Sequence, residues 1–333
     1  MVFAATNIGF QSIAEQGLGK ANPAATTVVF QSTDGGQTWQ EVSTGLPEDL
    51  QIWGVYTGSD EVFIGTRDGL YRSSSSSAAA PKWEQVLFLD GSITDVFPGR
   101  NGLFACSYER GLFQNIPSTE VWKAMNLKDK KVRTVLETPD GNVFVGTDNG
   151  IFKSADGGQT WKQVFEEGIV LNIVASGGVL IGGGVRGVLR STDGGEHWDW
   201  ALDENILARK TGLIGERFVT ILGTEDPSKV IPEGITYRLR ASADGGKTWQ
   251  RMEKPLGPIQ GAYDMDKRLS EAKDIYDIMQ SGKYLFCSFD VGVFRSSDQG
   301  KRWELVLPSN EKWVFNFAVS GQVIYAVRAN VGC

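Results

Sequence analysis

Short apolar stretches alternate with turns rich in glycine and aspartate along almost the whole chain. Four strands are expected in one clearly delimited unit, over 131–137, 142–147, 150–154 and 161–165. Other units superpose on its second and third strands, at 62–66 with 69–72 and at 285–289 with 292–295. Apolar runs bounded by tight turns favour strands, and continuous runs are typical of strands packed on both faces. The pattern predicts an all-β fold of four-stranded antiparallel units.

An eight-residue signature, Ser-x-Asp-x-Gly followed by a closing Trp, starts at residues 32, 154, 191, 242 and 296. Degenerate copies keep only the Trp, so a tryptophan closes seven units, at Trp39, Trp83, Trp122, Trp161, Trp198, Trp249 and Trp303. Their spacing fits propeller blades, which need roughly 40 residues each. The first strands give the same count through one small or polar residue each, at Gly54, Asp95, Thr134, Asn172, Gly212, Asp277 and Asn316. The sequence predicts a seven-bladed β-propeller.

The two ends of the chain supply complementary halves of one blade. Residues 314–319 and 323–328 resemble the first two strands of a unit, and 27–32 with 39–42 resemble the missing pair. Pairing them would close the ring and remove its open edges. We therefore expect one domain over 1–333, with insertions on one face near 9–25, 199–207, 224–234 and 253–273. A further strand-like segment at 2–6 has no place in this count.

The signature residues are suited to building a turn. An aspartate in a hairpin turn accepts backbone N–H bonds from its own turn, glycine supplies positive φ, and tryptophan packs beneath. The signature resembles the Asp-box, or BNR, repeat of sialidases, sortilin-type receptors, xyloglucanases and Ycf48/Hcf136-like photosystem II assembly factors. The resemblance implies that the boxes lie at the periphery. We therefore interpret the box aspartates as structural: Asp34, Asp156, Asp193, Asp244 and Asp298.

Two functions from different classes are compatible with this resemblance. The runs at 93–97 and 275–279 are similar to the Leu-x-Asp-Ile-x-Phe run of Ycf48-like repeats, which implies a non-catalytic binding or assembly module for a protein or glycan. That family's His-Gly-Trp-x-Val-Gly run is absent. The alternative is a sialidase-like or other glycoside hydrolase, although those sialidases have six blades and an Arg-Ile-Pro motif that this chain lacks. Shared folds host unrelated functions, so the fold alone does not choose.

The long connections point to one face, where loops on a rigid scaffold usually carry function. Cations at turns and before first strands would bind a carboxylate or other anion there, or would simply solvate the surface: Arg67, Arg110, Arg186, Lys131 and Arg209. Asp95 and Asp277 would be a catalytic carboxylate pair, or would hydrogen-bond across blades. Trp53 and Trp313, with Tyr263 and Tyr276, would stack on sugars or pack. The segment 262–281 would be a lid carrying Asp264, Asp266 and Lys267, or a plain connection.

Composition narrows the partners further. The net charge is −7 with dispersed cations, which does not support nucleic-acid binding. Cys106 and Cys287 fall in different units, too far apart for a disulfide, and are expected to be buried. With a single histidine, His197, we expect no metal and no cofactor. We also expect no membrane insertion, a monomer, and a periplasmic or secreted protein whose leader is absent from this chain, with a cytosolic location as the alternative.

Overall fold

The computed structural model describes residues 28–47, 50–58, 61–74, 82–88, 91–116, 119, 121–127, 130–223, 237–252, 275–309 and 313–329. The segment 2–6 and the expected insertions near 9–25, 224–234 and 253–273 lie outside the described residues. So do Tyr263, Asp264, Asp266 and Lys267 of the proposed lid.

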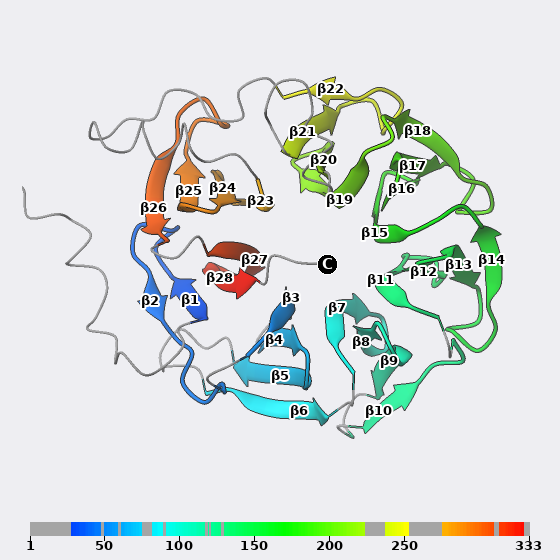
Figure 1. The fold of residues 1–333 in the computed structure, drawn as a ribbon, viewed down its shortest axis with the longest axis horizontal. Helices are drawn as coiled ribbons and strands as arrows, with labels where there is room; N and C mark the ends of the chain where they lie inside the picture. Colours follow the sequence, from blue (N-terminus) through cyan, green and yellow to red (C-terminus); the bar gives the residue numbers. More distant parts are fainter. Residues whose placement is uncertain are drawn as a thin grey trace, which may run out of the picture.

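The described strands form seven four-stranded antiparallel sheets arranged as blades around a central axis (Figure 1). This confirms the prediction of a seven-bladed all-β propeller. Blade 1 comprises β3(Ile52–Thr57), β4(Glu61–Thr66), β5(Gly69–Ser74) and β6(Glu84–Phe88). Blade 2 comprises β7(Ile93–Gly99), β8(Gly102–Ser107), β9(Gly111–Ile116) and β10(Val121–Ala124). Blade 3 comprises β11(Val132–Glu137), β12(Val143–Thr147), β13(Gly150–Ser154) and β14(Lys162–Phe165).

The next three blades repeat this order along the chain. Blade 4 comprises β15(Val170–Ser176), β16(Val179–Gly184), β17(Gly187–Ser191) and β18(Asp199–Asp203). Blade 5 comprises β19(Leu207–Ile214), β20(Arg217–Gly223), β21(Tyr237–Ser242) and β22(Gln250–Arg251). Blade 6 comprises β23(Asp277–Ser281), β24(Tyr284–Phe289), β25(Gly292–Ser296) and β26(Glu304–Pro308). The first strand of each of these blades lies nearest the axis (Figure 1).

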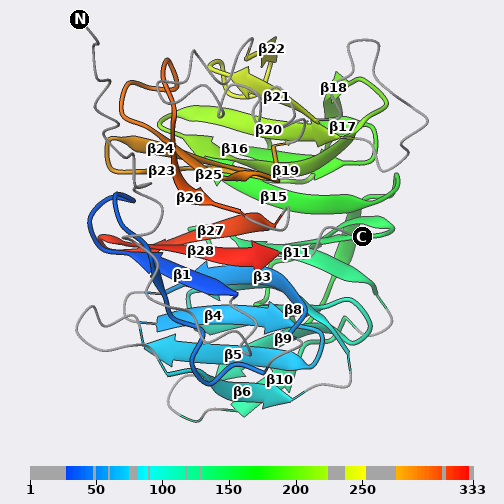
Figure 2. The ribbon, with the colours of Figure 1, turned by 60° about the vertical axis from the view of Figure 1, so that its left-hand side comes forward.

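Blade 7 joins the two ends of the described chain. Its strands are β27(Val314–Ser320), β28(Val323–Ala329), β1(Val29–Ser32) and β2(Gln40–Glu41). Strands β1 and β28 pair antiparallel, from Val29 opposite Val327 to Ser32 opposite Ile324 (Figure 2). The predicted ring closure is confirmed. The indole N–H of Trp83 then ties blade 1 to this blade through the Val42 carbonyl at 2.7 Å.

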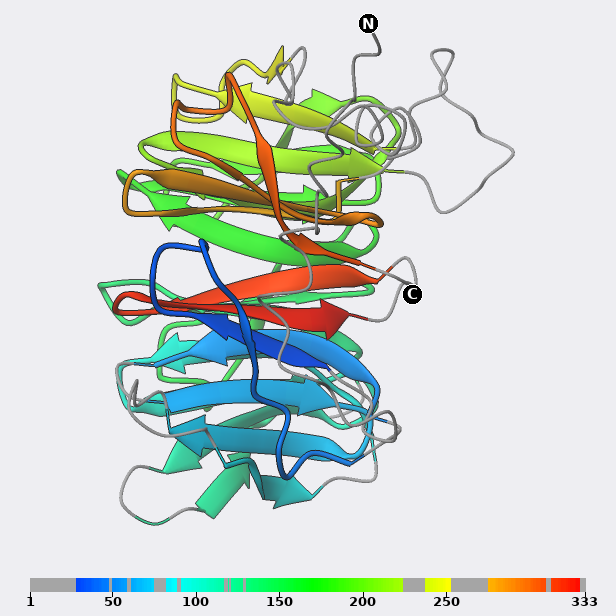
Figure 3. The same cartoon turned by 90° about the vertical axis from the view of Figure 1, so that its left-hand side faces the viewer.

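The strands run between two faces of the ring (Figure 3). Because neighbouring strands are antiparallel, the turns after each first strand and the signature turns lie on one face, which we call the signature face. The turns after each second strand and the links between blades lie on the other, which we call the cavity face. Residues 199–203, which were expected in a link, form β18 instead, because they pair with β17. The Trp200 ring also packs edge-on against the Phe165 ring, with 5.8 Å between the ring centres.

Glycines in the second strands let neighbouring blades approach closely, as expected from the sequence. A Cβ at Gly65 would lie 2.6 Å from the Ile93 carbonyl oxygen of the next blade. At Gly146 the corresponding distance, to the Val170 carbonyl oxygen, is 2.7 Å. These contacts bring the first strand of one blade against the second strand of the previous one, where no side chain fits. The spaces between blades are otherwise filled by buried aromatic and aliphatic side chains.

Each signature aspartate is used within its own turn. Asp156 accepts hydrogen bonds from the backbone N–H groups of Gln159 and Thr160, both at 2.9 Å, and from the hydroxyls of Thr160 and Ser154. The Thr160 hydroxyl and N–H contribute most to lowering the pKa of this carboxyl below its usual range. At the other copies the aspartate again accepts the serine hydroxyl and a backbone N–H of its own turn: Asp34, Asp193, Asp244 and Asp298. In the Asp298 copy Arg302 stands at the threonine position, so the second hydroxyl is missing. At Asp193 the ring of His197 takes the place of the threonine hydroxyl.

We expect Asp156→Ala to lower the unfolding midpoint at pH 7. The pKa of Asp156 is lowered by folding, so its stabilising effect is present above the unfolded pKa near 4 and is lost as the pH falls through the folded pKa. The difference in denaturant midpoint between wild type and variant should therefore shrink in strongly acidic solution. Glu166→Ala, at an exposed neighbouring position, is the control. A difference that is the same at pH 7 and at acidic pH would contradict this account.

Candidate functional site

A β-bulge near the start of the first strand recurs in five consecutive blades. The pairing register shifts by one residue there, so the bulged residues are Trp53, Thr94, Arg133, Leu171 and Arg209. A bulge leaves its residue outside the regular alternation and turns its side chain in a new direction. All five side chains line one axial cavity of about 490 Å³. The repeated bulge therefore builds the wall of this cavity.

The cavity lies toward the cavity face, since the bulges are close to the links that enter each first strand. Besides the bulged residues, it is lined by the charged groups Asp95, Glu109 and Lys210, by the rings of Tyr108 and Tyr276, and by the apolar side chains Ile221, Ile275, Val314 and Ala329. A concave site with apolar walls and a few placed polar groups is the usual form of a binding site.

A chain of polar contacts links the first strands from blade 4 round to blade 1. The amide of Asn172 donates to the Arg209 carbonyl at 3.0 Å. The ammonium of Lys210 lies 2.6 Å from Asp277 Oδ2, and that oxygen also accepts the backbone N–H of Phe317 at 2.8 Å. The last link runs from Asn316 to the Trp53 carbonyl at 3.3 Å. Each contact crosses from one blade to the next.

The structure corrects one member of the expected series of small or polar first-strand residues. The bulge at Arg209 places Lys210 opposite Ile221, in the register that Asn172 and Thr134 occupy in their blades. Gly212, the residue expected there, lies two positions further along β19. The sequence alignment was wrong because it looked for a small or polar residue between apolar neighbours, whereas Lys210 is long and lies between Arg209 and Thr211.

The two candidate carboxylates have different surroundings. Asp277 is only 1 % exposed, and its Oδ2 is already bound by Lys210 and Phe317. Asp95 lines the cavity, and its Oδ1 accepts the backbone N–H of Val96 at 2.8 Å. Burial raises the pKa of Asp95 to about 7, against the smaller lowering effects of Val96 and Lys210. Only Asp95 is therefore placed to meet a molecule in the cavity.

We expect Asp95→Asn to be more stable than the wild type at pH 8. Between about pH 4 and pH 7 the folded chain holds a proton on Asp95 that the unfolded chain releases, so stability falls as the pH rises through this window. We expect a gain of about 1–3 kcal/mol at pH 8, less than full burial would give because the side chain borders the cavity. Denaturant unfolding at pH 8 and below pH 4 measures it. An equal gain at both pH values would contradict the assignment.

Arg133, one of the cations in the cavity wall, is held by an acid. Arg133 donates to Asp148 at 2.7 Å, and the Tyr108 hydroxyl donates to the same carboxylate at 3.0 Å. The guanidinium of Arg133 and the ammonium of Lys131 also lie over the Tyr108 ring, 4.5 and 4.9 Å from its centre. Sequence reasoning missed Tyr108, Arg133 and Asp148. A Tyr and an Asp in neighbouring second-to-third strand turns were the available signal.

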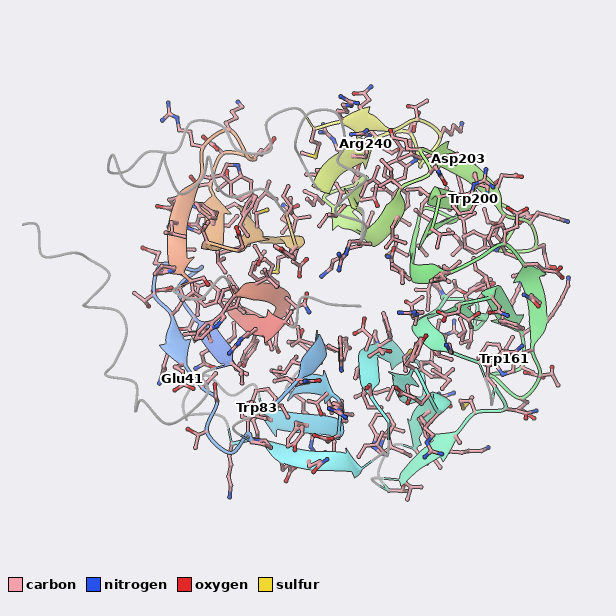
Figure 4. All side chains as sticks on the ribbon, viewed as in Figure 1. Glu41, Trp83, Trp161, Trp200, Asp203 and Arg240 are labelled. Carbon is pink, nitrogen blue, oxygen red and sulfur yellow. The ribbon has the colours of Figure 1, made fainter. Side chains whose placement is uncertain are left out.

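The predicted arginine cluster is not assembled at the cavity. Of its five members, Arg209 lines the cavity. Arg186 instead lies over the Trp200 ring, 5.3 Å from its centre, and pairs with Asp203 and Glu167. Trp200 and Asp203 belong to the outermost strand of blade 4, away from the axis (Figure 4). Arg67 and Arg110 are exposed at turns, outside the cavity lining, and Lys131 contacts Tyr108 beside it.

The two candidate tryptophans are also separated. Trp53 lines the cavity, and its indole N–H has no hydrogen-bond partner among the described residues. Trp313 is outside the lining and carries the guanidinium of Arg328 over its ring at 4.6 Å. Trp53 therefore remains a candidate to contact a ligand, whereas the Trp313 ring already packs against a cation.

The described part of the chain offers little further chemistry for a site. Within it, no group of three or more His, Cys, Asp or Glu side chains is arranged to hold a metal ion. Cys106 and Cys287 are buried free thiols, as expected. No helix among the described residues has the length and apolar character needed to cross a membrane.

No family model and no curated protein matches the chain. Solved structures match its fold. YCF48 bound to D1 peptide is 13% identical with a TM-score of 0.59, over 86% of this chain and 96% of that chain. YCF48 from Cyanidioschyzon merolae is 11% identical with a TM-score of 0.58, over 85% and 96%. An ancestral GH74 enzyme is 15% identical with a TM-score of 0.54, over 86% of this chain and 41% of the enzyme. At these identities the likeness establishes the propeller fold, shared with a peptide-binding protein and with an enzyme.

Proposed function

We propose that this chain is a non-catalytic binding propeller of the Asp-box type that recognises a segment of another protein at the axial cavity of its cavity face. The observation that carries the proposal is the cavity itself, which five repeated bulges line with one side chain each. Its lining mixes apolar side chains with aromatic rings and a few charges. Such a surface suits a polypeptide, which presents apolar groups and backbone amides together.

The contacts of the two aspartates favour binding over glycoside hydrolysis. Hydrolysis of a glycosidic bond ordinarily uses two carboxyl groups that both reach the substrate. Asp277 is enclosed and engaged by Lys210 and Phe317, so it supports the ring of first strands. Asp95 therefore lacks the predicted catalytic partner, and Glu109, the other carboxylate that lines the cavity, accepts the backbone N–H of Ser92. That YCF48 has been solved with a D1 peptide gives a precedent for a propeller of this fold binding a protein segment.

Peptide binding to a designed pair of variants tests the proposal. Leu171→Trp places a large side chain at a bulged position and should block the cavity. Val121→Trp, on the outermost strand of blade 2 where Val121 is 53% exposed, is the matched control. On an array of random dodecapeptides we expect a set of sequences bound by the wild type and by Val121→Trp and lost in Leu171→Trp. An array without any such set would refute a polypeptide ligand.

The same proteins, assayed with fluorogenic sialosides and xyloglucan oligosaccharides, test the enzymatic alternative. We expect no turnover. Turnover abolished by Asp95→Asn would establish a hydrolase in place of the binding function. Binding of the oligosaccharides without turnover, again lost in Leu171→Trp, would identify a glycan as the ligand.

A further inference from the structure

Two cations that line the cavity already have acidic partners. At the cavity, Lys210 is bound to Asp277 and Arg133 to Asp148. Among the carboxylates lining the cavity, Glu109 accepts the backbone N–H of Ser92 at 2.8 Å. Neither Glu109 nor Asp95 forms an ion pair with a described residue, and Oδ1 of Asp95 accepts the backbone N–H of Val96. Glu109 is exposed to solvent, whereas Asp95 is half-buried, so Asp95 is the carboxylate of the cavity wall whose charge is compensated least by water or by an opposite charge.

The chain of contacts between blades explains why Asp95 is left over. At the corresponding position in blades 4 to 7, Asn172, Lys210, Asp277 and Asn316 each contact the first strand of the next blade. Asp95 occupies this position in blade 2, where it accepts a hydrogen bond from Val96 of its own strand. It does not take part in holding two blades together. A group of this kind, facing a cavity, is free to serve a ligand.

Trp53 and Gly54 shape the space next to this carboxylate. A Cβ at Gly54 would lie 2.8 Å from Asp95 Oδ1, so the absence of a side chain there makes room for the carboxyl group. The adjacent Trp53 is a bulged residue of the cavity wall, with its carbonyl held by Asn316. Trp53 and Asp95 line the same cavity from neighbouring blades. A cavity that offers both an indole ring and a carboxylate suits an organic cation, because the negative face of the ring and the carboxylate both attract it.

We propose that the cavity binds a cationic group of its polypeptide ligand, a lysine or arginine side chain or an amino terminus, with Asp95 as its counter-ion and Trp53 beside it. This inference rests on the proposed function and names the chemistry that it requires. It replaces the expectation of an anion site, which depended on arginines that the structure does not bring together. A cation at Asp95 would neutralise a half-buried carboxylate that has no ion-pair partner among the described residues.

Matched peptides test this inference. Sequences selected on the array are synthesised with acetylated amino termini and carboxyl-terminal amides, in versions with lysine, arginine, norleucine or glutamate at the central position. A further version has norleucine at the centre and a free amino terminus. We expect the lysine and arginine versions to bind more tightly than norleucine and glutamate, and the free-terminus version shows whether an α-amino group can substitute. Calorimetry gives each affinity.

Two variants connect the preference to Asp95. Asp95→Asn keeps the size of the side chain and removes its charge, and should weaken binding of the cationic peptides about ten-fold or more. Glu216→Gln removes an exposed charge from a turn on the signature face and should leave the affinity unchanged. Near-ultraviolet circular dichroism verifies that both variants are folded.

The outcomes separate this inference from the proposed function. Cationic peptides that bind Asp95→Asn as tightly as the wild type overturn the inference. The inference is also overturned if the glutamate peptides bind most tightly and their binding is lost in Leu171→Trp. In that case the proposed function would still stand. If no peptide binding is lost in Leu171→Trp, the proposed function fails and the inference fails with it.

Discussion

Glu204→Ala is expected to destabilise the fold by about 3–5 kcal/mol, because it leaves a buried guanidinium without its counter-ion. Arg240 is 3% exposed and forms hydrogen bonds to both carboxylate oxygens of Glu204, at 2.8 Å each from Nη2. In other blades, the residue two positions before the signature serine is apolar, as at Phe152, Leu189 and Phe294. Arg240 is therefore a charge in a place that otherwise belongs to the core.

Denaturant unfolding of three proteins measures this effect. Glu84→Ala removes the exposed partner of Arg72, which keeps Glu61 nearby, and should cost less than about 1 kcal/mol. The double variant Arg240→Phe with Glu204→Leu replaces the pair by apolar groups and should recover most of the stability lost in Glu204→Ala. If Glu204→Ala is no more destabilised than Glu84→Ala, the pair is not effectively buried in solution.

Gly150→Ala should be nearly as damaging, with a loss of at least about 3 kcal/mol. Gly150 begins β13 with a φ of +103°, and an added Cβ would lie 1.9 Å from the carbonyl oxygen of Phe165 on β14. The obstacle is backbone, so relief requires the outermost strand of blade 3 to move. The hairpin between β13 and β14 would lose part of its pairing.

Gly157→Ala is the control for the backbone conformation alone. Gly157 has a φ of +71° in the signature turn, and a Cβ there would have no atom within 4 Å. We expect a cost of about 1–2 kcal/mol from the left-handed conformation. Thermal unfolding followed by circular dichroism compares the two variants. Equal losses would show that the contact with Phe165 adds nothing to the conformational cost.

The fold could be predicted from the sequence because its determinants are local and repeated. Each signature contains the aspartate, the glycine and the tryptophan that one turn needs, so a copy at Ser154 can be recognised without knowing its neighbours. Ring closure followed from the incomplete units at both ends. The link expected over 199–207 was misjudged, because a strand that begins directly after Trp198 differs little in composition from a polar loop.

The candidate site was only partly predictable, because it depends on register. Trp53 and Arg209 were singled out from the sequence, but Arg133 and Leu171 were not, and all four owe their direction to a bulge. A bulge inserts a residue without any residue type that marks it. Whether a cation reaches the cavity also depends on which acidic side chain it pairs with. Arg186 is drawn away by Asp203 and Glu167, which are far from it in the sequence.

Blade 7 combines strands from both ends of the described chain, which affects how the protein folds while the ribosome makes it. Strands β1 and β2 are made first, but the edge that receives them belongs to β28, near the other end of the chain. Until that strand emerges, Val29 and Phe30, almost fully buried in the finished ring, have no sheet to join. Vectorial folding can build blades 1 to 6 in order. We therefore expect the nascent chain to form an open arc of blades with the apolar strand β1 still unpaired. The ring closes only after β27 and β28 have left the ribosome.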